Sequence, residues 1–371
     1  PRPDAQVRIL DVGRKSEAQF ALSPDTQPVP DHWSNYAITV ARRIARDFPA
    51  AYTGADIVLS SDLPRASGMS SSSALVIAVF FALGEANSLW QSDPYRRCIE
   101  SRPGSNERLA GYLAAVESGA GFASFPGDSG VGTLGGSQDH VAILCSRAGF
   151  LRQYSYCPIR LEREIPVPAK HVFVLAVSGI KAKKTGSARD SYNRASLATR
   201  QILDLWRRAT GRNDESLAAA LSSSPDAAKR LREIARNSAN SGVSADFLPN
   251  RLDHFAAESN EIIPAAADAL ASNDMVTVGA LVDRSQLLAE TLLGNQTPET
   301  VELARLARTL GADAASAFGA GFGGSVWALV PAARAEEFRH AWTSRYHQRF
   351  PERAEASQFL ITGAGPGLIQ F

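Results

Sequence analysis

The sequence lacks an excess of charge of either sign and has no long apolar run. Its 371 residues contain 39 Lys and Arg against 38 Asp and Glu, a formal net charge of +1, which provides no electrostatic field to gather nucleic acid or an anionic membrane. We find no secretory signal and no apolar stretch of membrane-spanning length. We therefore expect a small-molecule partner, no nucleic acid and no membrane.

Cysteine and histidine are sparse as well. The three cysteines, Cys98, Cys145 and Cys157, are odd in number and show no CxxC spacing, so we expect buried thiols in a reducing cytoplasm. The six histidines form no HxxxH or HExxH pair, which disfavours a transition-metal site.

The length of the chain predicts more than one domain. A domain takes roughly 150 residues, and 44% of the residues are apolar, which is enough for two sizeable cores. The Pro-Val-Pro segment at residues 166–168 is the predicted boundary, giving domains 1–166 and 167–371.

Apolar patterns predict a mixture of strands and helices. Two strands, Val141–Cys145 and Phe150–Tyr156, are predicted to form a hairpin, and the glycine-rich stretch 119–136 a long loop. The other predicted elements are strands at Val7–Val12, Ala55–Ser60, Val172–Val177, Ser325–Val330 and Phe359–Thr362, and helices at Trp33–Asp47, Ala74–Ala86, Glu107–Glu117, Ser191–Arg208, Ser216–Leu221, Asp226–Ser238, Leu252–Ala271, Met275–Leu292, Pro298–Leu310 and Ala332–Arg345.

A glycine and four consecutive serines precede the apolar helix predicted to begin at Ala74. This segment, Leu63–Ala74, reads LPRASGMSSSSA. A helix N-terminus has unpaired N–H groups and partial positive charge, so a small-residue entry lets an anion approach them. A simple N-cap is the alternative explanation. The absence of GxxxxGK[ST] excludes a Walker-type loop.

Two carboxylates are candidates for chemistry beside such a phosphate site. Asp139, in the glycine-flanked segment Gly135–His140, could accept a proton from a hydroxyl group or could cap a turn. Glu117 ends a predicted helix before the glycine run, and it is either a hard-oxygen ligand for magnesium or a solvated helix carboxylate. A second glycine-rich turn, Gly319–Gly324, precedes a strand and opens no helix, which disfavours a Rossmann site.

These three loops, in this order, resemble those of the GHMP kinase family. The serine segment is similar to the family's ATP-binding motif, and Gly319–Gly324 to its C-terminal glycine motif. Trp33–Tyr36, Ser191–Arg194 and Arg251–Glu258 resemble segments of the galactokinase branch. The resemblance implies an α+β protein of two domains, one ribosomal-S5-like and one ferredoxin-like, with ATP in the cleft between them.

The resemblance also implies an activity and its residues. It implies a cytoplasmic kinase, monomeric or a weak homo-oligomer, that uses ATP and Mg²⁺ to phosphorylate the anomeric hydroxyl of galactose or a related aldose. By motif position, it implies Asp139 as the residue that activates the sugar hydroxyl, Tyr192 as a sugar contact, Ser72 and Glu117 as magnesium ligands, Gly68, Ser70, Ser71, Ser72 and Ser73 as the triphosphate cradle, and Gly319, Gly321 and Gly323 on the substrate side.

The sequence departs from the galactokinase pattern in two places. Ser137-Gln-Asp-His140 is nearer the Gly-Gly-x-Gln-Asp-Gln of fucose and heptose kinases than the Gly-x-Met-Asp-Gln of galactokinases, and the family's N-terminal Gly-Glu-His-Thr-Asp-Tyr-like motif has no counterpart. A fucose, heptose-phosphate or uronic-acid kinase on the same fold therefore stays open, as does a non-catalytic sugar sensor. The presence of Asp139, Glu117 and all four serines favours an enzyme.

Overall fold

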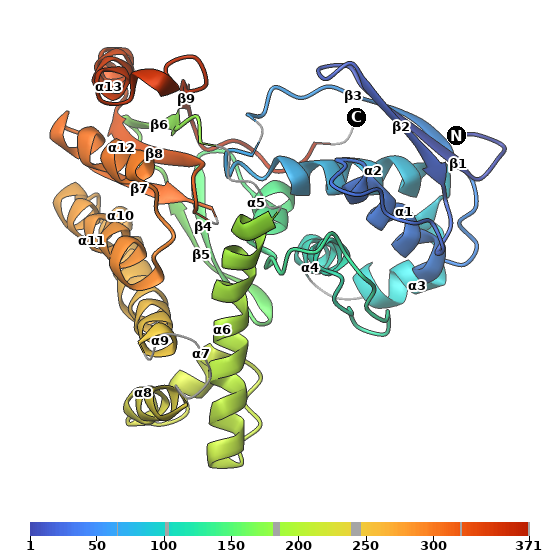
Figure 1. The fold of residues 1–371 in the computed structure, drawn as a ribbon, viewed down its shortest axis with the longest axis horizontal. Helices are drawn as coiled ribbons and strands as arrows, with labels where there is room; N and C mark the ends of the chain where they lie inside the picture. Colours follow the sequence, from blue (N-terminus) through green and yellow to red (C-terminus); the bar gives the residue numbers. More distant parts are fainter. Residues whose placement is uncertain (65, 101–103, 181–185, 239–245, 320, 370–371) are drawn as a thin grey trace.

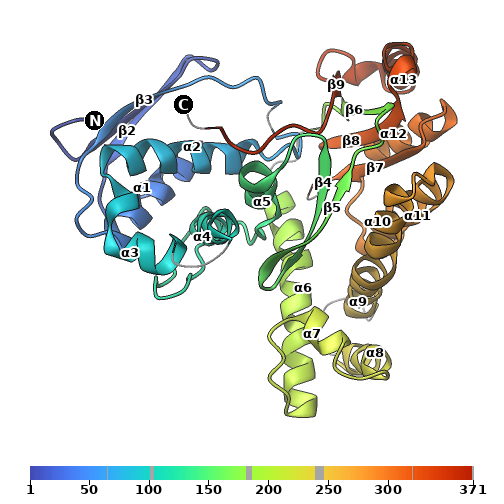
Figure 2. The same cartoon turned by 180° about the vertical axis from the view of Figure 1, so that it is seen from behind.

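The computed structural model describes residues 1–64, 66–100, 104–180, 186–238, 246–319 and 321–369, with 186–192 described as backbone alone. The elements form an α+β fold, as predicted. Two halves lie side by side in both views, and a group of helices extends from the second half (Figures 1 and 2). Within these ranges, no helix is both long and apolar enough to cross a bilayer.

The first half, residues 1–145, is a three-stranded sheet with helices packed against it. Strand β1 lies between β2, to which it is antiparallel, and β3, to which it is parallel. The elements of this half are β1 (Gln6–Asp11), β2 (Ser16–Ala21), α1 (Asn35–Asp47), β3 (Ala55–Leu59), α2 (Ser71–Ala86), η1 (Leu89–Gln91), α3 (Asp93–Tyr95), η2 (Arg96–Glu100), α4 (Ser105–Ser118) and α5 (Gln138–Cys145).

One face of this sheet and the helices α1, α2 and α4 enclose the first core. Alternate residues of β1, Val7 and Ile9, are fully buried, as the period of a half-buried strand requires. Helix α1 contributes a stripe that includes Val40 and Ile44 at a spacing of one turn. Helix α2 is apolar on most of its surface and is enclosed on several sides, as predicted. Its burial fixes the position of the serine turn at its start.

The second half contains a four-stranded antiparallel sheet with helices on both faces. The strand order is β7-β8-β6-β9, with α12 and α13 packed on one face and α10 and α11 on the other. The elements are β4 (Phe150–Tyr156), β5 (Ile159–Pro166), β6 (His171–Val177), α6 (Gly186–Thr210), α7 (Leu217–Leu221), α8 (Ala227–Asn237), α9 (Phe247–Ala257), η3 (Glu258–Ile262), α10 (Ile263–Ala271), α11 (Met275–Leu288), η4 (Ala289–Leu293), α12 (Pro298–Thr309), β7 (Ala314–Phe318), β8 (Ser325–Pro331), η5 (Ala332–Arg334), α13 (Ala335–Arg349), η6 (Pro351–Arg353) and β9 (Gln358–Thr362).

The predicted strand at Val141–Cys145 is wrong, because these residues form most of helix α5. Val141, Leu144 and Cys145 are buried at helical spacing, and a short apolar run of this kind fits a buried helix as well as a strand. Strand β4 pairs instead with β5, which follows it in the sequence, whereas the predicted partner precedes it. As a consequence, Asp139 lies in the first turn of a helix, and not in a flexible loop.

The prediction of three buried thiols is confirmed for two of them. Cys98 and Cys145 are buried, and Cys157 is exposed at the turn between β4 and β5. Burial, as the main cause, raises the pKa of the Cys145 thiol to about 12. The Cys145 thiol is therefore protonated and unreactive at neutral pH.

The segment after β9 returns to the first half, where the ribbon ends beside it (Figure 1). The N–H of Leu368 donates to the carbonyl of Ile143 at 2.8 Å, and that of Gly367 to the carbonyl of Ser146 at 2.9 Å. The last carbonyls of a helix have no partner within it. The segment therefore satisfies such groups at the C-terminal end of α5.

Three arginines of α1 hold the glycine-rich loop 119–136. Arg42 donates two hydrogen bonds to the Asp128 carboxylate, at 2.8 and 3.1 Å. Arg43 donates to the carbonyl of residue 120 at 3.0 Å, and Arg46 donates to the carbonyls of residues 126 and 127, both at 2.6 Å. Phe122 and Phe125 anchor part of the loop in the first core, and the arginine bonds hold its glycine-rich backbone.

Arg43 and Asp47 form an ion pair inside the first core. Their Nε and Oδ2 atoms are 2.8 Å apart, and their side chains are 1% and 0% exposed. The Tyr112 hydroxyl donates to the same Oδ2 at 3.0 Å. Burial, followed by the charge of Asp47, raises the pKa of Tyr112 well above its usual value. The three side chains therefore form one buried polar cluster.

We predict that Arg43→Met lowers the free energy of unfolding by about 3–5 kcal/mol, because it removes the hydrogen-bonded cation of the buried Asp47 carboxylate and leaves only Arg46, whose Nε is 3.9 Å from Asp47 Oδ1. Urea unfolding followed by circular dichroism measures the change. Arg97→Met is the matched control, because Arg97 pairs with Asp93 at the same helical spacing but the two side chains are 76% and 79% exposed; it should cost less than about 1 kcal/mol. Equal losses in the two variants would contradict the prediction.

Candidate active site

The four serines form the entry of α2, which begins at Ser71, three residues earlier than predicted. Ser70 precedes the helix in the left-handed backbone region, with φ +56°, and its side chain makes no capping hydrogen bond within the described residues. The simple N-cap explanation therefore does not account for Ser70. The first N–H groups of α2 have no partner within the helix, and all four serines line one cavity.

This cavity, of about 480 Å³, lies where the two halves meet. Its walls come from the β1–β2 hairpin, from α1, α2, α4 and α5 and from the β7–β8 turn. The residues that line it are Arg14, Trp33, Tyr36, Ala66, Ser67, Gly68, Ser70, Ser71, Ser72, Ser73, Leu75, Ala114, Glu117, Ser118, Gly135, Gly136, Gln138, Asp139, His140, Gly319, Gly321 and Phe322.

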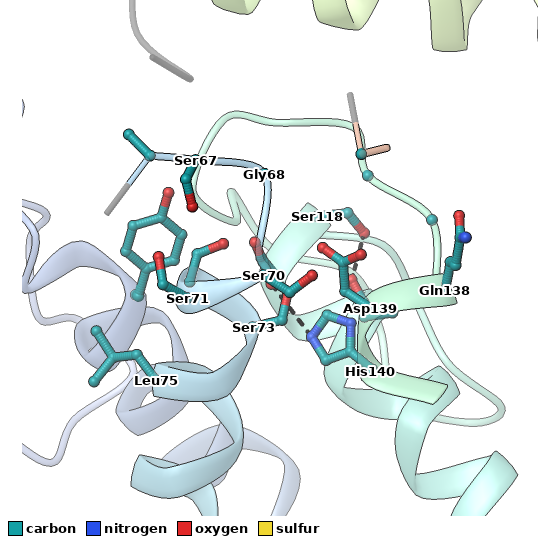
Figure 3. Close-up of a pocket in the computed structure, with 18 of the residues that line it drawn as sticks. Ser67, Gly68, Ser70, Ser71, Ser73, Leu75, Ser118, Gln138, Asp139 and His140 are labelled. Carbon is teal, nitrogen blue, oxygen red and sulfur yellow. Dashed lines mark hydrogen bonds and ion pairs between the residues drawn. The ribbon is translucent and has the colours of Figure 1, made fainter. Parts of the chain in front are cut away.

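Asp139 lies across this cavity from the serine turn. Figure 3 shows Ser70, Ser71 and Ser73 on one side and Asp139 with His140 on the other. Asp139 is the second residue of α5, and the following residues Val141 and Leu144 are buried in the first core. Packing of α5 thus holds the carboxylate at the cavity wall. The structure brings together the two groups that the sequence placed in separate loops.

Glu117, in the last turn of α4, is buried and hydrogen-bonded, so it is not a solvated helix carboxylate. Glu117 is 6% exposed, and Ser73 Oγ donates a hydrogen bond to Glu117 Oε2 at 2.9 Å. The Nε2 atom of His140, which is 2% exposed, lies 3.2 Å from the same oxygen. His140 therefore packs directly against Glu117.

Burial and the charge of the Glu117 carboxylate affect the pKa of Tyr36, which lies on α1. Burial, and after it the charge of Glu117, raises the pKa of Tyr36 to about 12, while a hydrogen bond with Ser72 opposes the shift. The tyrosine is therefore protonated throughout the physiological range. It connects α1 to the start of α2 at the cavity wall.

The glycine-rich turn Gly319–Gly324 joins β7 to β8 and packs against the serine turn. A Cβ added at Gly319 would lie 3.1 Å from the carbonyl oxygen of Gly68. Ser325 Oγ donates to the carbonyl of Ser67 at 2.7 Å, in a buried position. The turn follows a strand, β7, that the sequence did not predict. The backbones of the β7–β8 turn and the serine turn are therefore in direct contact where the two halves join.

The glycines of this turn occupy different surroundings. Gly319 and Gly321 line the cavity, whereas Gly323 is buried against Ile180 and is not among the residues that line it. Gly321 has φ +78°, and an added Cβ would lie 2.3 Å from the carbonyl oxygen of Asn295. Only a residue without a side chain fits there.

Other residues at the cavity could not be predicted from the sequence, or their side chains are not described. Arg14, in the β1–β2 hairpin, lies over the ring of Trp33 at 5.4 Å and pairs with Asp11 at 2.8 Å. A lone arginine in a turn gives no indication of such a position. Tyr192 belongs to the backbone of α6, but its side chain lies outside the described residues.

Comparisons with known proteins agree with this geometry. The family model for the GHMP kinases N terminal domain matches residues 35–122, and the model for GHMP kinases C terminal matches residues 266–348. A galactokinase of Chloroflexus aggregans is 29% identical over 99% of this chain and 83% of its own length, and one of Chloroflexus aurantiacus is 28% identical with the same coverage.

The fold agrees as well. The crystal structure of Lactococcus lactis galactokinase complexed with galactose superposes with a TM-score of 0.74 at 21% identity, covering 99% of this chain and 84% of that one. Fold, site and family models define a kinase, a phosphotransferase that acts on an alcohol group. The chain is similar to GHMP kinases in both of its halves. The predicted two-domain fold of that family is confirmed.

We predict that Gly321→Ala destabilises the protein by at least about 1–2 kcal/mol, the cost of a left-handed backbone for a residue with a Cβ, with a further cost from the contact with Asn295. The apparent melting temperature should fall by several degrees. Gly363→Ala is the control, because an added Cβ there meets nothing within 4 Å. Unchanged melting of the Gly321 variant would show that the turn can move away from Asn295.

Proposed function

We propose that the protein is a sugar kinase that transfers the γ-phosphate of ATP to the anomeric hydroxyl of galactose or a related aldose. Galactokinases are the relatives matched over nearly the whole chain, which supports this substrate class. The observation that carries the proposal is the arrangement of the serine turn and Asp139 on opposite sides of one cavity. Its volume of about 480 Å³ lies within the range of small-ligand sites.

The start of α2 is the proposed triphosphate cradle. Ser70, Ser71 and Ser72 offer hydroxyl groups to the cavity, and the first turn of α2, which includes Ser73, offers backbone N–H groups. Gly68 adopts φ +79°, and an added Cβ would lie 3.3 Å from the carbonyl of Phe318. The lack of a side chain at this position leaves the backbone open to phosphate.

The oxygen donors beside the cradle fit a magnesium ion. Ser72 and Glu117 both line the cavity, and hard cations prefer hydroxyl and carboxylate oxygens. Magnesium bound with ATP would neutralise phosphate charge. We assign Ser72 and Glu117 to hold it, with Ser73 fixing one oxygen of the Glu117 carboxylate by its 2.9 Å hydrogen bond.

Asp139 is the proposed catalytic residue. The sugar hydroxyl oxygen forms a bond to the γ-phosphorus while the bond from that phosphorus to the β–γ bridging oxygen breaks. ADP leaves, and the hydroxyl proton passes to the Asp139 carboxylate. The N–H groups at the start of α2 hold the phosphates in line with the attacking hydroxyl.

The substrate side is assigned to the second half of the chain. Tyr192, Gly319, Gly321 and Gly323 are the proposed residues, with Gly323 acting through packing against Ile180 and the other two glycines lying at the cavity wall. We place the domain boundary between residues 166 and 167, after β5, so that the β4–β5 hairpin, described above with the second half, goes with the first domain, against whose core Tyr154 and Ile159 pack. We also propose that the enzyme acts in the cytoplasm, as a monomer or weak homo-oligomer.

We predict that Asp139→Asn lowers kcat about 10²- to 10⁴-fold, the usual contribution of a general base, and leaves the KM for ATP nearly unchanged. A coupled assay of ADP release with galactose, galacturonate, arabinose, fucose, heptoses and heptose phosphates measures turnover, and phosphorus NMR identifies the phosphorylated hydroxyl. Asp226→Asn is the control, because Asp226 also flanks the start of a helix, α8, outside the cavity.

The assay distinguishes a kinase of another sugar, a sugar sensor, and a kinase that does not use Asp139. Turnover that is best with fucose, a uronic acid or a heptose phosphate would replace galactose as the substrate while keeping the reaction. Sugar binding without turnover of any sugar would indicate a sensor and contradict the kinase proposal. Full activity of the Asp139 variant would remove that residue from the mechanism.

A further inference from the structure

The side chain of Asn193, on α6, holds the backbone of the loop that leads to Asp139. The N–H of Leu134 donates to Asn193 Oδ1 at 2.9 Å, and Asn193 Nδ2 donates to the carbonyl of Gly132 at 3.0 Å. A side-chain amide has one acceptor and two donor hydrogens, so it can bind a peptide N–H and a peptide carbonyl together. The Asn193 side chain thus makes the pair of backbone hydrogen bonds that a neighbouring β-strand would make.

The held segment lies immediately before the cavity. Gly135 and Gly136 follow Leu134 and line the cavity, and Asp139 comes three residues later. Two successive glycines give the backbone wide conformational freedom. The orientation of the segment that enters α5 therefore depends on how firmly its preceding residues are fixed.

Among the described residues, the other hydrogen bonds of the loop lie on either side of this segment. Before it, the N–H of Val131 donates to the carbonyl of Glu117 at 2.9 Å; after it, the first helical bond of α5 runs from Val141 to the carbonyl of Ser137, also at 2.9 Å. Between these points, for residues 132–136, the hydrogen bonds from the described part of the chain are the two from Asn193.

We propose that Asn193 is a positioning residue for Asp139. It ties the second half of the chain, through α6, to the loop that sets the start of α5 in the first half, and so sets the distance from the Asp139 carboxylate to the substrate hydroxyl. This inference rests on the proposed function of Asp139. Asn193 touches neither reacting atom and acts through residues 132–136.

A positioning role and a merely structural role have different consequences. Two hydrogen bonds at a partly exposed site contribute little net stability. Displacement of a catalytic group by about 1 Å can cost about 10²-fold in rate. Loss of the Asn193 amide should therefore lower kcat strongly while melting temperature and the KM for ATP change little.

Asn87 supplies a matched control. Its side chain accepts from the N–H of Thr53 at 2.9 Å and donates to the carbonyl of Thr53 at 2.9 Å, the same two-way contact with backbone. It also donates to the carbonyl of Leu83 at 2.9 Å. Asn87 is not among the residues that line the cavity. Asn87→Leu therefore removes an equivalent set of bonds at no less structural cost.

The first experiment compares Asn193→Leu with Asn87→Leu in the assay of ADP release. We expect kcat to fall about 10- to 100-fold in Asn193→Leu, with a KM for ATP within about twofold of wild type, and kcat to be retained in Asn87→Leu. Asn193→Asp, which keeps the acceptor for the Leu134 N–H, should recover part of the loss. Wild-type kcat in Asn193→Leu would overturn the inference and leave the proposed function intact.

The second experiment asks whether Asn193 acts through Asp139. In the Asp139→Asn background, Asn193→Leu should lower kcat little further, because residues that act as a unit are not additive. A full additional loss would overturn the inference. Hydrogen–deuterium exchange of the peptide containing Leu134 should be faster in Asn193→Leu, and unchanged exchange would likewise contradict it. Absence of kinase activity in the wild type would remove the proposed function, and this inference with it.

Discussion

The shape of the cavity depends on the contact between the β7–β8 turn and the entry of α2. The buried hydrogen bond from Ser325 to the carbonyl of Ser67, at 2.7 Å, and the close approach of Gly319 to Gly68 join the β7–β8 turn to the entry of α2. Because glycines occupy the contact, the chains approach without side chains between them. The triphosphate cradle proposed at the serine turn is thereby within reach of groups from both halves.

The polar groups of the site are supported by a buried framework. Helix α2 is enclosed by apolar contacts, so its exposed first turn keeps one position. Glu117 is held by Ser73 and lies beside His140, while α5 is packed in the first core through Val141. Preorganisation of this kind is what phosphoryl transfer requires, since its catalysis rests on alignment and charge.

The sequence pointed to segments that the structure brings to one cavity where the signal is local, and their roles stay predictions. Small residues before an apolar helix predict a phosphate cradle because N–H groups at a helix start are unpaired whatever the surroundings. The sequence did not predict β2, β5 or β7, and it assigned Val141–Cys145 to a strand. Such short segments take their structure from tertiary pairing. The contacts of Arg14 and Asn193 join residues distant in sequence and leave no local pattern.

The hydrogen bonds between residues 367–368 and the end of α5 have a consequence for biosynthesis. A chain still being translated cannot form them before residues 367–368 have been added, although the sequence of α5 has long been complete. Such contacts between distant segments form late, after the loop between them closes. The first half can collapse around its own core early, but the helix that carries Asp139 acquires its final support only when residues 367–368 have emerged.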